Sequence, residues 1–147
     1  MADILKNYIL LSAVVSWFAA QLFKVIMGMI HHKKFRMIKL FVSSGGMPSS
    51  HSASVSALCT ASGFEYGIAS FQFAVTFILA MIVMHDAAGV RNQVGKQAKV
   101  INKMKEGNVI ECFENINLKE LVGHTPLQVC VGSILGIAVT FCFGQLY

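Results

Sequence analysis

The residues best suited to chemistry are two histidines, each beside small and polar residues. His51 lies in "SSGGMPSSHSAS", residues 43–54, and His124 lies in "GHTPLQV", residues 123–129. Both stretches combine a proline with Ser or Thr, which is typical of helix N-termini. The free N–H groups of a helix N-terminus bind anions, and an imidazole can move a proton near neutral pH. The two stretches therefore predict a phosphate site flanked by histidines.

The stretch before His51 has the parts of a phosphate cradle. Pro48 favours an initiating turn, and Ser49 or Ser50 can cap the helix that follows. Gly46 allows the backbone to approach a ligand closely. The alternative interpretation is a well-capped helix that binds no ligand.

The stretch around His124 repeats this pattern. Thr125 is expected as the N-cap and Pro126 as the first helical residue. Gln128 has two candidate roles, because it can complete a capping box or orient the ring of His124 through its amide oxygen. Each histidine taken alone could also be an ordinary helix-end residue.

Three further ionisable residues are candidates for the same site. Lys24 interrupts an apolar run, where it either extends toward lipid headgroups or binds a phosphate. Asp86 and Arg91 follow another apolar run and are expected either to form a structural ion pair or to take part in the site.

The composition indicates what kind of protein must position these residues. The chain has 147 residues, of which 55% are hydrophobic and 13% are charged. Soluble domains carry roughly 25% charged residues, so we expect one membrane-embedded domain over residues 1–147. The net charge of +5 does not indicate nucleic-acid binding, because ten of the twelve Lys and Arg residues fall in two blocks beside apolar runs. These blocks are Lys33, Lys34, Arg36 and Lys39, then Arg91, Lys96, Lys99, Lys103, Lys105 and Lys119.

The apolar runs predict an all-α integral membrane bundle with about four spans. Residues 7–30, 67–85 and 125–146 are long and apolar enough to cross a bilayer. Residues 50–64 are shorter and rich in serine, with alanines at positions 53, 57 and 61 that allow close helix approach. We expect this fourth span to be shielded by the others.

Four spans also give a consistent orientation. With the N-terminus outside, both basic blocks lie on the cytoplasmic side, as the positive-inside rule requires, and the C-terminus lies outside. Both histidines, Asp86 and Arg91 then lie at the cytoplasmic boundary, with Lys24 about two turns inside it. Residues 89–105 carry an apolar stripe with lysines on other faces, which predicts an amphipathic helix at the cytoplasmic headgroups.

These motifs resemble those of a known family. "MPSSHSA" resembles the second motif of the type 2 phosphatidic acid phosphatase superfamily, and "GHTPLQVCVGSILG" resembles the distal part of its third motif. The order of "SSGGMPSSHSA", "DAAGVRNQVGKQAKVIN" and "LVGHTPLQV" is similar to the divergent branch described as acid phosphatase/vanadium-dependent haloperoxidase-related. The resemblance runs from about Lys24 to the C-terminus.

The resemblance implies a role for each candidate residue. His124 would be the nucleophile that forms a phosphohistidine, and His51 would be the general acid. The phosphate oxygens would be held by Lys24, Ser49, Ser50, Gly46 and Arg91. The resemblance implies no metal and no cofactor.

Two positions depart from the family pattern. Gln128 stands where the superfamily has a carboxylate four residues after its nucleophile, so Asp86 is an alternative partner for His124. Arg91 precedes His124 by 33 positions, whereas the superfamily places its arginine a few residues before the histidine.

The sequence thus predicts a phosphatase of the plasma membrane that acts on an amphiphilic phosphomonoester or pyrophosphate at the cytoplasmic face. Phosphatidylglycerophosphate and isoprenoid (pyro)phosphates are candidate substrates. The alternative is a non-catalytic membrane protein that binds anionic lipid or phosphate. Because four spans make a thin bundle, a homodimer is also expected.

Overall fold

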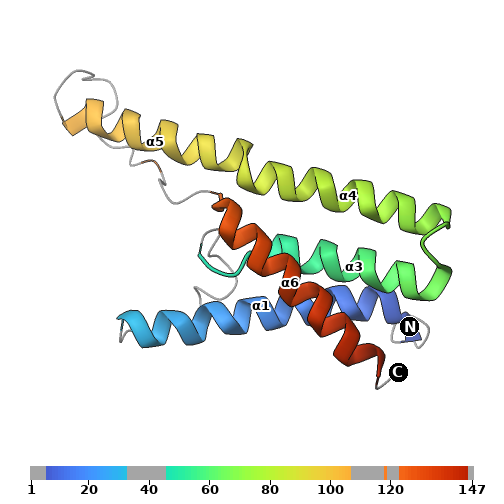
Figure 1. The fold of residues 1–147 in the computed structure, drawn as a ribbon. Helices are drawn as coiled ribbons and strands as arrows, with labels where there is room; N and C mark the ends of the chain where they lie inside the picture. Colours follow the sequence, from blue (N-terminus) through green and yellow to red (C-terminus); the bar gives the residue numbers. More distant parts are fainter. Residues whose placement is uncertain (1–5, 33–45, 107–117, 119–122, 146–147) are drawn as a thin grey trace.

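The computed structural model describes residues 6–32, 46–106, 118 and 123–145, and within them it contains five helices (Figure 1). The first basic block, at 33–39, lies outside these residues, as does Lys119 of the second. The helices are α1 (Tyr8–His32), α3 (Ser50–Tyr66), α4 (Phe71–Ala88), α5 (Val90–Glu106) and α6 (Pro126–Gly144).

Local capping residues determine where three of these helices begin. The side chains of Ser49, Ser70 and Thr125 each accept a hydrogen bond from the first turn of α3, α4 and α6, respectively. Gly67 ends α3 with a positive φ of 80°, a conformation that glycine adopts without the steric cost of a Cβ atom. The helix boundaries therefore follow directly from the polar residues between the apolar runs.

Among the residues that the structure describes, three helical stretches are long and apolar enough to cross a bilayer: Tyr8–Ile30, Phe71–Met104 and Pro126–Gly144. Large apolar side chains cover their outer surfaces, among them Phe18, Ile82 and Ile134. Such a surface suits lipid acyl chains and is unsuited to water. The prediction of a helical membrane bundle is confirmed.

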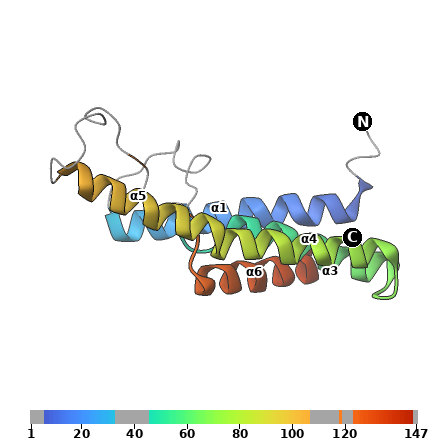
Figure 2. The same cartoon turned by 90° about the horizontal axis from the view of Figure 1, so that it is seen from above.

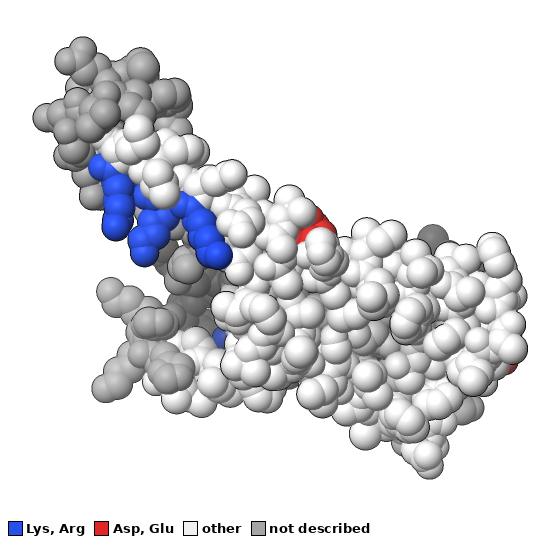
Figure 3. All heavy atoms as spheres, turned by 45° about the horizontal axis from the view of Figure 1, so that its top comes forward, with Lys and Arg blue, Asp and Glu red and all other residues white. Residues whose placement is uncertain are grey.

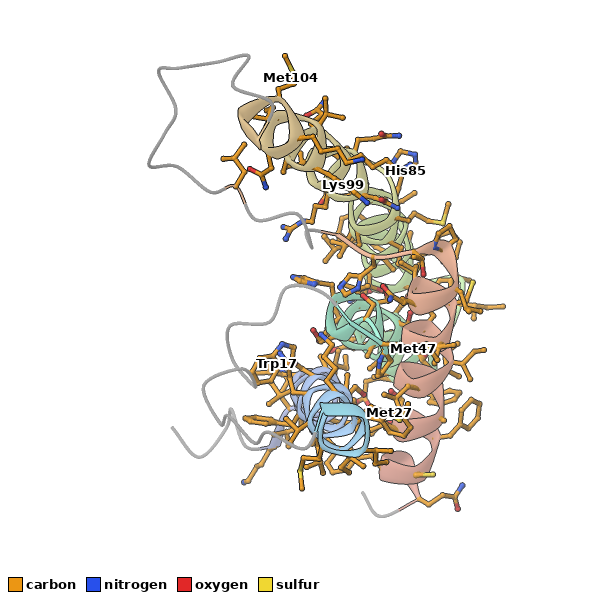
Figure 4. All side chains as sticks on the ribbon, turned by 90° about the vertical axis from the view of Figure 1, so that its left-hand side faces the viewer. Trp17, Met27, Met47, His85, Lys99 and Met104 are labelled. Atoms are coloured by element: carbon orange, nitrogen blue, oxygen red, sulfur yellow. The ribbon has the colours of Figure 1, made fainter. Side chains whose placement is uncertain are left out.

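The short helix α3 lies at the centre of this bundle. It packs against α1, α4 and α6, and viewed end-on it sits between α1 and α4 with α6 across their side (Figure 4). Its buried residues are all small: Ser50, Ser52, Ala53, Ser56, Ala57, Ala61 and Ser62. Small side chains let neighbouring backbones approach closely, so a helix that looks weak as a lipid-facing span is well suited to be shielded.

Two glycines set the contact between α3 and α6. A Cβ atom at Gly132 would collide with the backbone of Ser49, and one at Gly136 would collide with the backbone of Ala53. Farther along, the Thr140 hydroxyl donates to the Ala57 carbonyl at 3.4 Å. This close approach brings the N-terminus of α6 beside the N-terminus of α3.

The helix α5 continues the course of α4 beyond the bundle, after an interruption at Gly89 (Figures 1 and 2). It packs mainly against α4, so its outer part stands clear of α1 and α3. The expected apolar stripe is present, because Val90, Val94 and Ile101 are exposed along one side. Its position at the headgroups stays a prediction.

Candidate active site

The N-terminus of α3 is built around Ser49, which is fully buried. Its hydroxyl accepts hydrogen bonds from the Ser52 amide at 3.3 Å and the Ser52 hydroxyl at 3.0 Å. Its own amide donates to the Gln128 carbonyl at 3.1 Å, which joins α3 to α6. Of the two predicted caps, Ser49 is therefore the one used, and its hydroxyl is already engaged within the protein.

Lys24 reaches inward from α1 to this helix start. Its Nζ donates to the Ser50 hydroxyl at 3.3 Å, and the side chain is half-buried. An ammonium group here places a positive charge beside the first turn of α3, where the free N–H groups also favour an anion. This inward position argues against the alternative interpretation, in which the lysine side chain extends toward the lipid headgroups.

His51 occupies the first turn of α3 and is exposed. Its ring centroid lies 6.3 Å from that of His124, with 59° between the ring planes. It is also close enough to Lys24, Arg91 and Asp86 for all three charges to act on it. Two histidines that are 73 positions apart in the chain thus lie beside each other.

His124 is held by the junction of α4 and α5. Its amide donates to the Ala87 carbonyl at 2.9 Å, and its carbonyl accepts from Asn92 Nδ2 at 3.4 Å. The preceding Gly123 has a φ of +88°, and a Cβ atom there would collide with the backbone of Arg91 and Asn92. Only glycine fits this close crossing of two chain segments.

The imidazole of His124 is buried, with only 2% of the residue exposed. Its Nδ1 lies 3.3 Å from Gln128 Oε1, which also accepts from the Thr125 amide at 3.1 Å. Because that oxygen can only accept, the contact assigns the proton to Nδ1 and leaves the lone pair on Nε2. Nε2 has no hydrogen-bond partner in the part of the chain that the structure describes.

Gln128 therefore performs both of its predicted roles. It completes a capping box with Thr125, and the same amide oxygen contacts His124 Nδ1. Asp86, the alternative partner, instead binds Arg91, with 2.7 Å between Oδ2 and Nε. That pair is about half exposed, so it forms on the surface beside the two histidines.

Burial lowers the pKa of His124, because it removes water from the charged imidazolium. The hydrogen bond with Gln128 opposes this shift, and Lys24 and His51 reinforce it, while the Gly46 backbone beside the ring again favours the charged form. The net effect favours the neutral ring, with an unprotonated Nε2.

The structure thus brings together all nine predicted site residues at one end of the bundle, although their chemical roles stay predictions. Sequence reasoning missed two residues that hold His124: Gly123 and Asn92. Gly123 directly precedes a histidine and could have been read as a close-approach position. Asn92 offered no comparable signal, because its partner is a backbone carbonyl 32 positions away. Within the described residues there is no group of three or more His, Cys, Asp or Glu suited to a metal.

The chain is similar to known proteins over most of its length. Residues 5–139 match a family model described as the divergent PAP2 family. The chain is also similar to YuiD of Bacillus subtilis (strain 168), described as an uncharacterized membrane protein, with 39% identity over 161 aligned positions and 99% of each chain covered. No solved structure matches the chain.

Proposed function

The chain belongs to the divergent PAP2 family, and on that premise we propose that it is a membrane phosphatase. Its substrate would be an amphiphilic phosphomonoester or pyrophosphate, with the acyl or isoprenoid tail in lipid. One observation carries this proposal: the buried Nε2 of His124, with no partner among the described residues, shares a space with His51.

In the proposed first step, His124 Nε2 attacks the phosphorus. An N–P bond forms as the P–O bond to the leaving alcohol breaks, and His51 donates a proton to the leaving oxygen. In the second step, water attacks the phosphorus of the phosphohistidine and gives a proton to His51. The N–P bond breaks and phosphate is released. No metal or cofactor takes part in this proposal.

The ring separation is compatible with one phosphate. An attacking atom must lie about 3–3.5 Å from the phosphorus in a reactive complex. A proton donor must lie about 2.5–3.0 Å from the leaving oxygen. The ring centroids lie 6.3 Å apart, so both rings can contact one phosphate group, and in-line transfer, which adds the length of the P–O bond to these two contacts, requires their nitrogens to lie farther apart than the centroids do.

Positive groups support the charge on the transferred phosphoryl group. Lys24 and the N-terminus of α3 approach it from the bundle, and Arg91 approaches from the surface. Because Ser49 is engaged as a cap, Ser50 and the backbone near Gly46 are the better candidates to bind phosphate oxygens.

We also propose that the site faces the cytoplasm, as the positive-inside rule indicates. The helix α5, which carries Lys96 and Lys99, lies at the same end of the bundle as the starts of α3 and α6, whereas α1 begins and α6 ends at the other end (Figure 1). This orientation favours a substrate made on the inner leaflet, for example phosphatidylglycerophosphate, over a carrier lipid recycled outside. A reporter enzyme fused to the C-terminus tests the sidedness.

The proposal is tested by phosphate release from the detergent-solubilised protein, with phosphatidylglycerophosphate and an isoprenoid diphosphate as separate substrates. His124→Ala should abolish release. His85→Ala is the matched control, because His85 is an exposed histidine on α4 that the mechanism does not use. Release that persists in His124→Ala would contradict the mechanism.

The second candidate function is binding of anionic lipid or phosphate without turnover. Gln128 favours it, because an amide in contact with Nδ1 cannot stabilise an imidazolium by charge as a carboxylate does. Phosphate binding without release by the wild-type protein would select this alternative.

A further inference from the structure

The helix α5 carries two opposed faces that the proposed mechanism does not use. Lys96, Lys99 and Lys103 are exposed and follow one another at i, i+3 and i+7, which places them on one side of the helix. Figure 3 shows Lys and Arg side chains gathered along one edge of α5, and no described acidic side chain pairs with these three lysines. The exposed Val94 and Ile101 lie on the opposite side.

The lysine row faces the same way as a residue that contacts the candidate active site. Asn92 precedes Lys96 by four residues, so it belongs to the same helix face. Its side chain donates to the carbonyl of His124. At about 1.5 Å per residue the row begins about 6 Å beyond Asn92 and extends about 11 Å further. The lysines therefore lead away from the helix start that carries His124.

We propose that Lys96, Lys99 and Lys103 bind the phosphate groups of anionic phospholipid headgroups at the membrane surface beside the site. Lysines near an anionic bilayer attract its headgroups, and clusters of them bind more strongly than one. The binding of headgroups does not depend on the proposed function. The idea that the bound lipids then enter the site as substrates rests on the proposed function.

The apolar face of α5 argues for a lipid surface as the source of these phosphates. Val90, Val94, Ile101 and Met104 are all exposed, and α5 continues directly from the apolar helix α4. Because α5 continues the course of the membrane-spanning α4, its lysines begin where the helix leaves the acyl chains, at the depth of the headgroups, and its aliphatic side chains suit contact with the lipid there. A helix that bound only soluble phosphate would leave this apolar face in water.

The test measures which lipids stay bound to the full-length protein. The protein is reconstituted in vesicles of equal parts phosphatidylcholine and phosphatidylglycerol, extracted in mild detergent, and analysed for co-purifying lipid. We expect wild-type protein to retain phosphatidylglycerol preferentially. In K96Q/K99Q/K103Q this preference should fall at least about fivefold, since a single lysine near an anionic surface accounts for about that factor.

The matched control is K96R/K99R/K103R, which keeps the charge and should keep the preference. Circular dichroism checks that both variants retain their helix content. An unchanged preference in the glutamine variant, or an equal loss in the arginine variant, would overturn the proposal. Soluble glycerol phosphate that strips phosphatidylglycerol better than chloride of equal ionic strength would assign the row to free phosphates and overturn the lipid assignment.

The same measurement in a His124→Ala background separates this inference from the proposed function. Lipid retention should be unchanged there, because His124 is not part of the lysine row. A protein that retains anionic lipid but releases no phosphate would refute the phosphatase proposal alone. A protein that releases phosphate but retains anionic lipid equally well with and without the three lysines would refute the lipid-binding proposal alone.

Discussion

The two histidine-bearing helix starts use the same residue types but give their histidines different surroundings. At α3 the histidine lies inside the helix, one residue after its start, and is exposed. At α6 the histidine precedes the N-cap and is buried, with Nδ1 in contact with Gln128. The histidine follows the cap in α3 and precedes it in α6, where Gln128 of the first helical turn contacts the ring.

This difference assigns separate roles to the rings in the proposed mechanism. A nucleophile benefits from a fixed tautomer and from exclusion of water, both of which His124 has. A proton donor that later takes a proton from the attacking water must be accessible to water, as the exposed His51 is. These separate roles can be tested by substituting residues at one helix N-terminus at a time.

The largest expected effect comes from His124→Asn. This variant should form no phosphohistidine, and turnover should fall at least about 10⁴-fold, as when a covalent nucleophile is removed. Brief incubation with ³²P-labelled substrate, followed by alkaline quench, detects the acid-labile N–P bond. Label of wild-type intensity in this variant, with His85→Asn as the control, would show that the nucleophile lies elsewhere.

His51→Gln should have the next largest effect, and the effect should depend on the substrate. With a lipid phosphate, whose alcohol leaves poorly, we expect a loss of about 10²–10⁴-fold because the general acid is gone. With p-nitrophenyl phosphate, whose leaving group needs no proton, the loss should be much smaller. Equal losses with both substrates would contradict the assignment of His51 as the acid.

Gln128→Ala should have a smaller effect on the start of α6. It removes the contact with His124 Nδ1 and one half of the capping box. Each hydrogen bond contributes on the order of 1 kcal/mol, so we expect a loss of about three- to tenfold in turnover and a modest loss of thermal stability. Thr125→Ala is the matched control, because it removes the cap but leaves Gln128 Oε1 beside His124. If Thr125→Ala lowers turnover as much as Gln128→Ala, the contact with His124 has no catalytic role of its own.

The smallest expected effect is a shift in pH dependence. Burial lowers the pKa of His124, so its neutral form should persist below the ordinary value of about 6.5. With p-nitrophenyl phosphate, whose leaving group needs no proton from His51, the rate of phosphohistidine formation should therefore be flat through this pH and fall only at lower pH. Gln128→Glu should move that fall to higher pH, because a carboxylate beside Nδ1 favours the charged ring. A fall centred at or above the ordinary value in the wild type would contradict this prediction.

Much of the fold follows from local sequence signals. The apolar runs, the caps at Ser49 and Thr125, and the serine-rich span at 50–64 predicted the helices and the shielded position of α3. The divergent family was also identified correctly from the motifs around the two histidines. These features can be predicted from the sequence because they depend on residues within one or two helical turns of each other.

The path of α5 was less predictable. Its amphipathic pattern is plain in the sequence, but its continuation of α4 depends on the backbone conformation at Gly89. The two possible roles of Gln128 also stayed open, because one side chain with two nearby donors can serve either or both.

By itself the sequence determined that this is a helical membrane protein of the divergent PAP2 family with two capped, histidine-bearing helix starts. Only the tertiary structure decided that these starts meet, because the approach depends on Gly132 and Gly136 fitting against the backbone of α3. It also decided which histidine is buried, since His124 is covered where Gly123 crosses the backbone of Arg91 and Asn92. Such contacts join residues far apart in the chain, and no local pattern encodes them.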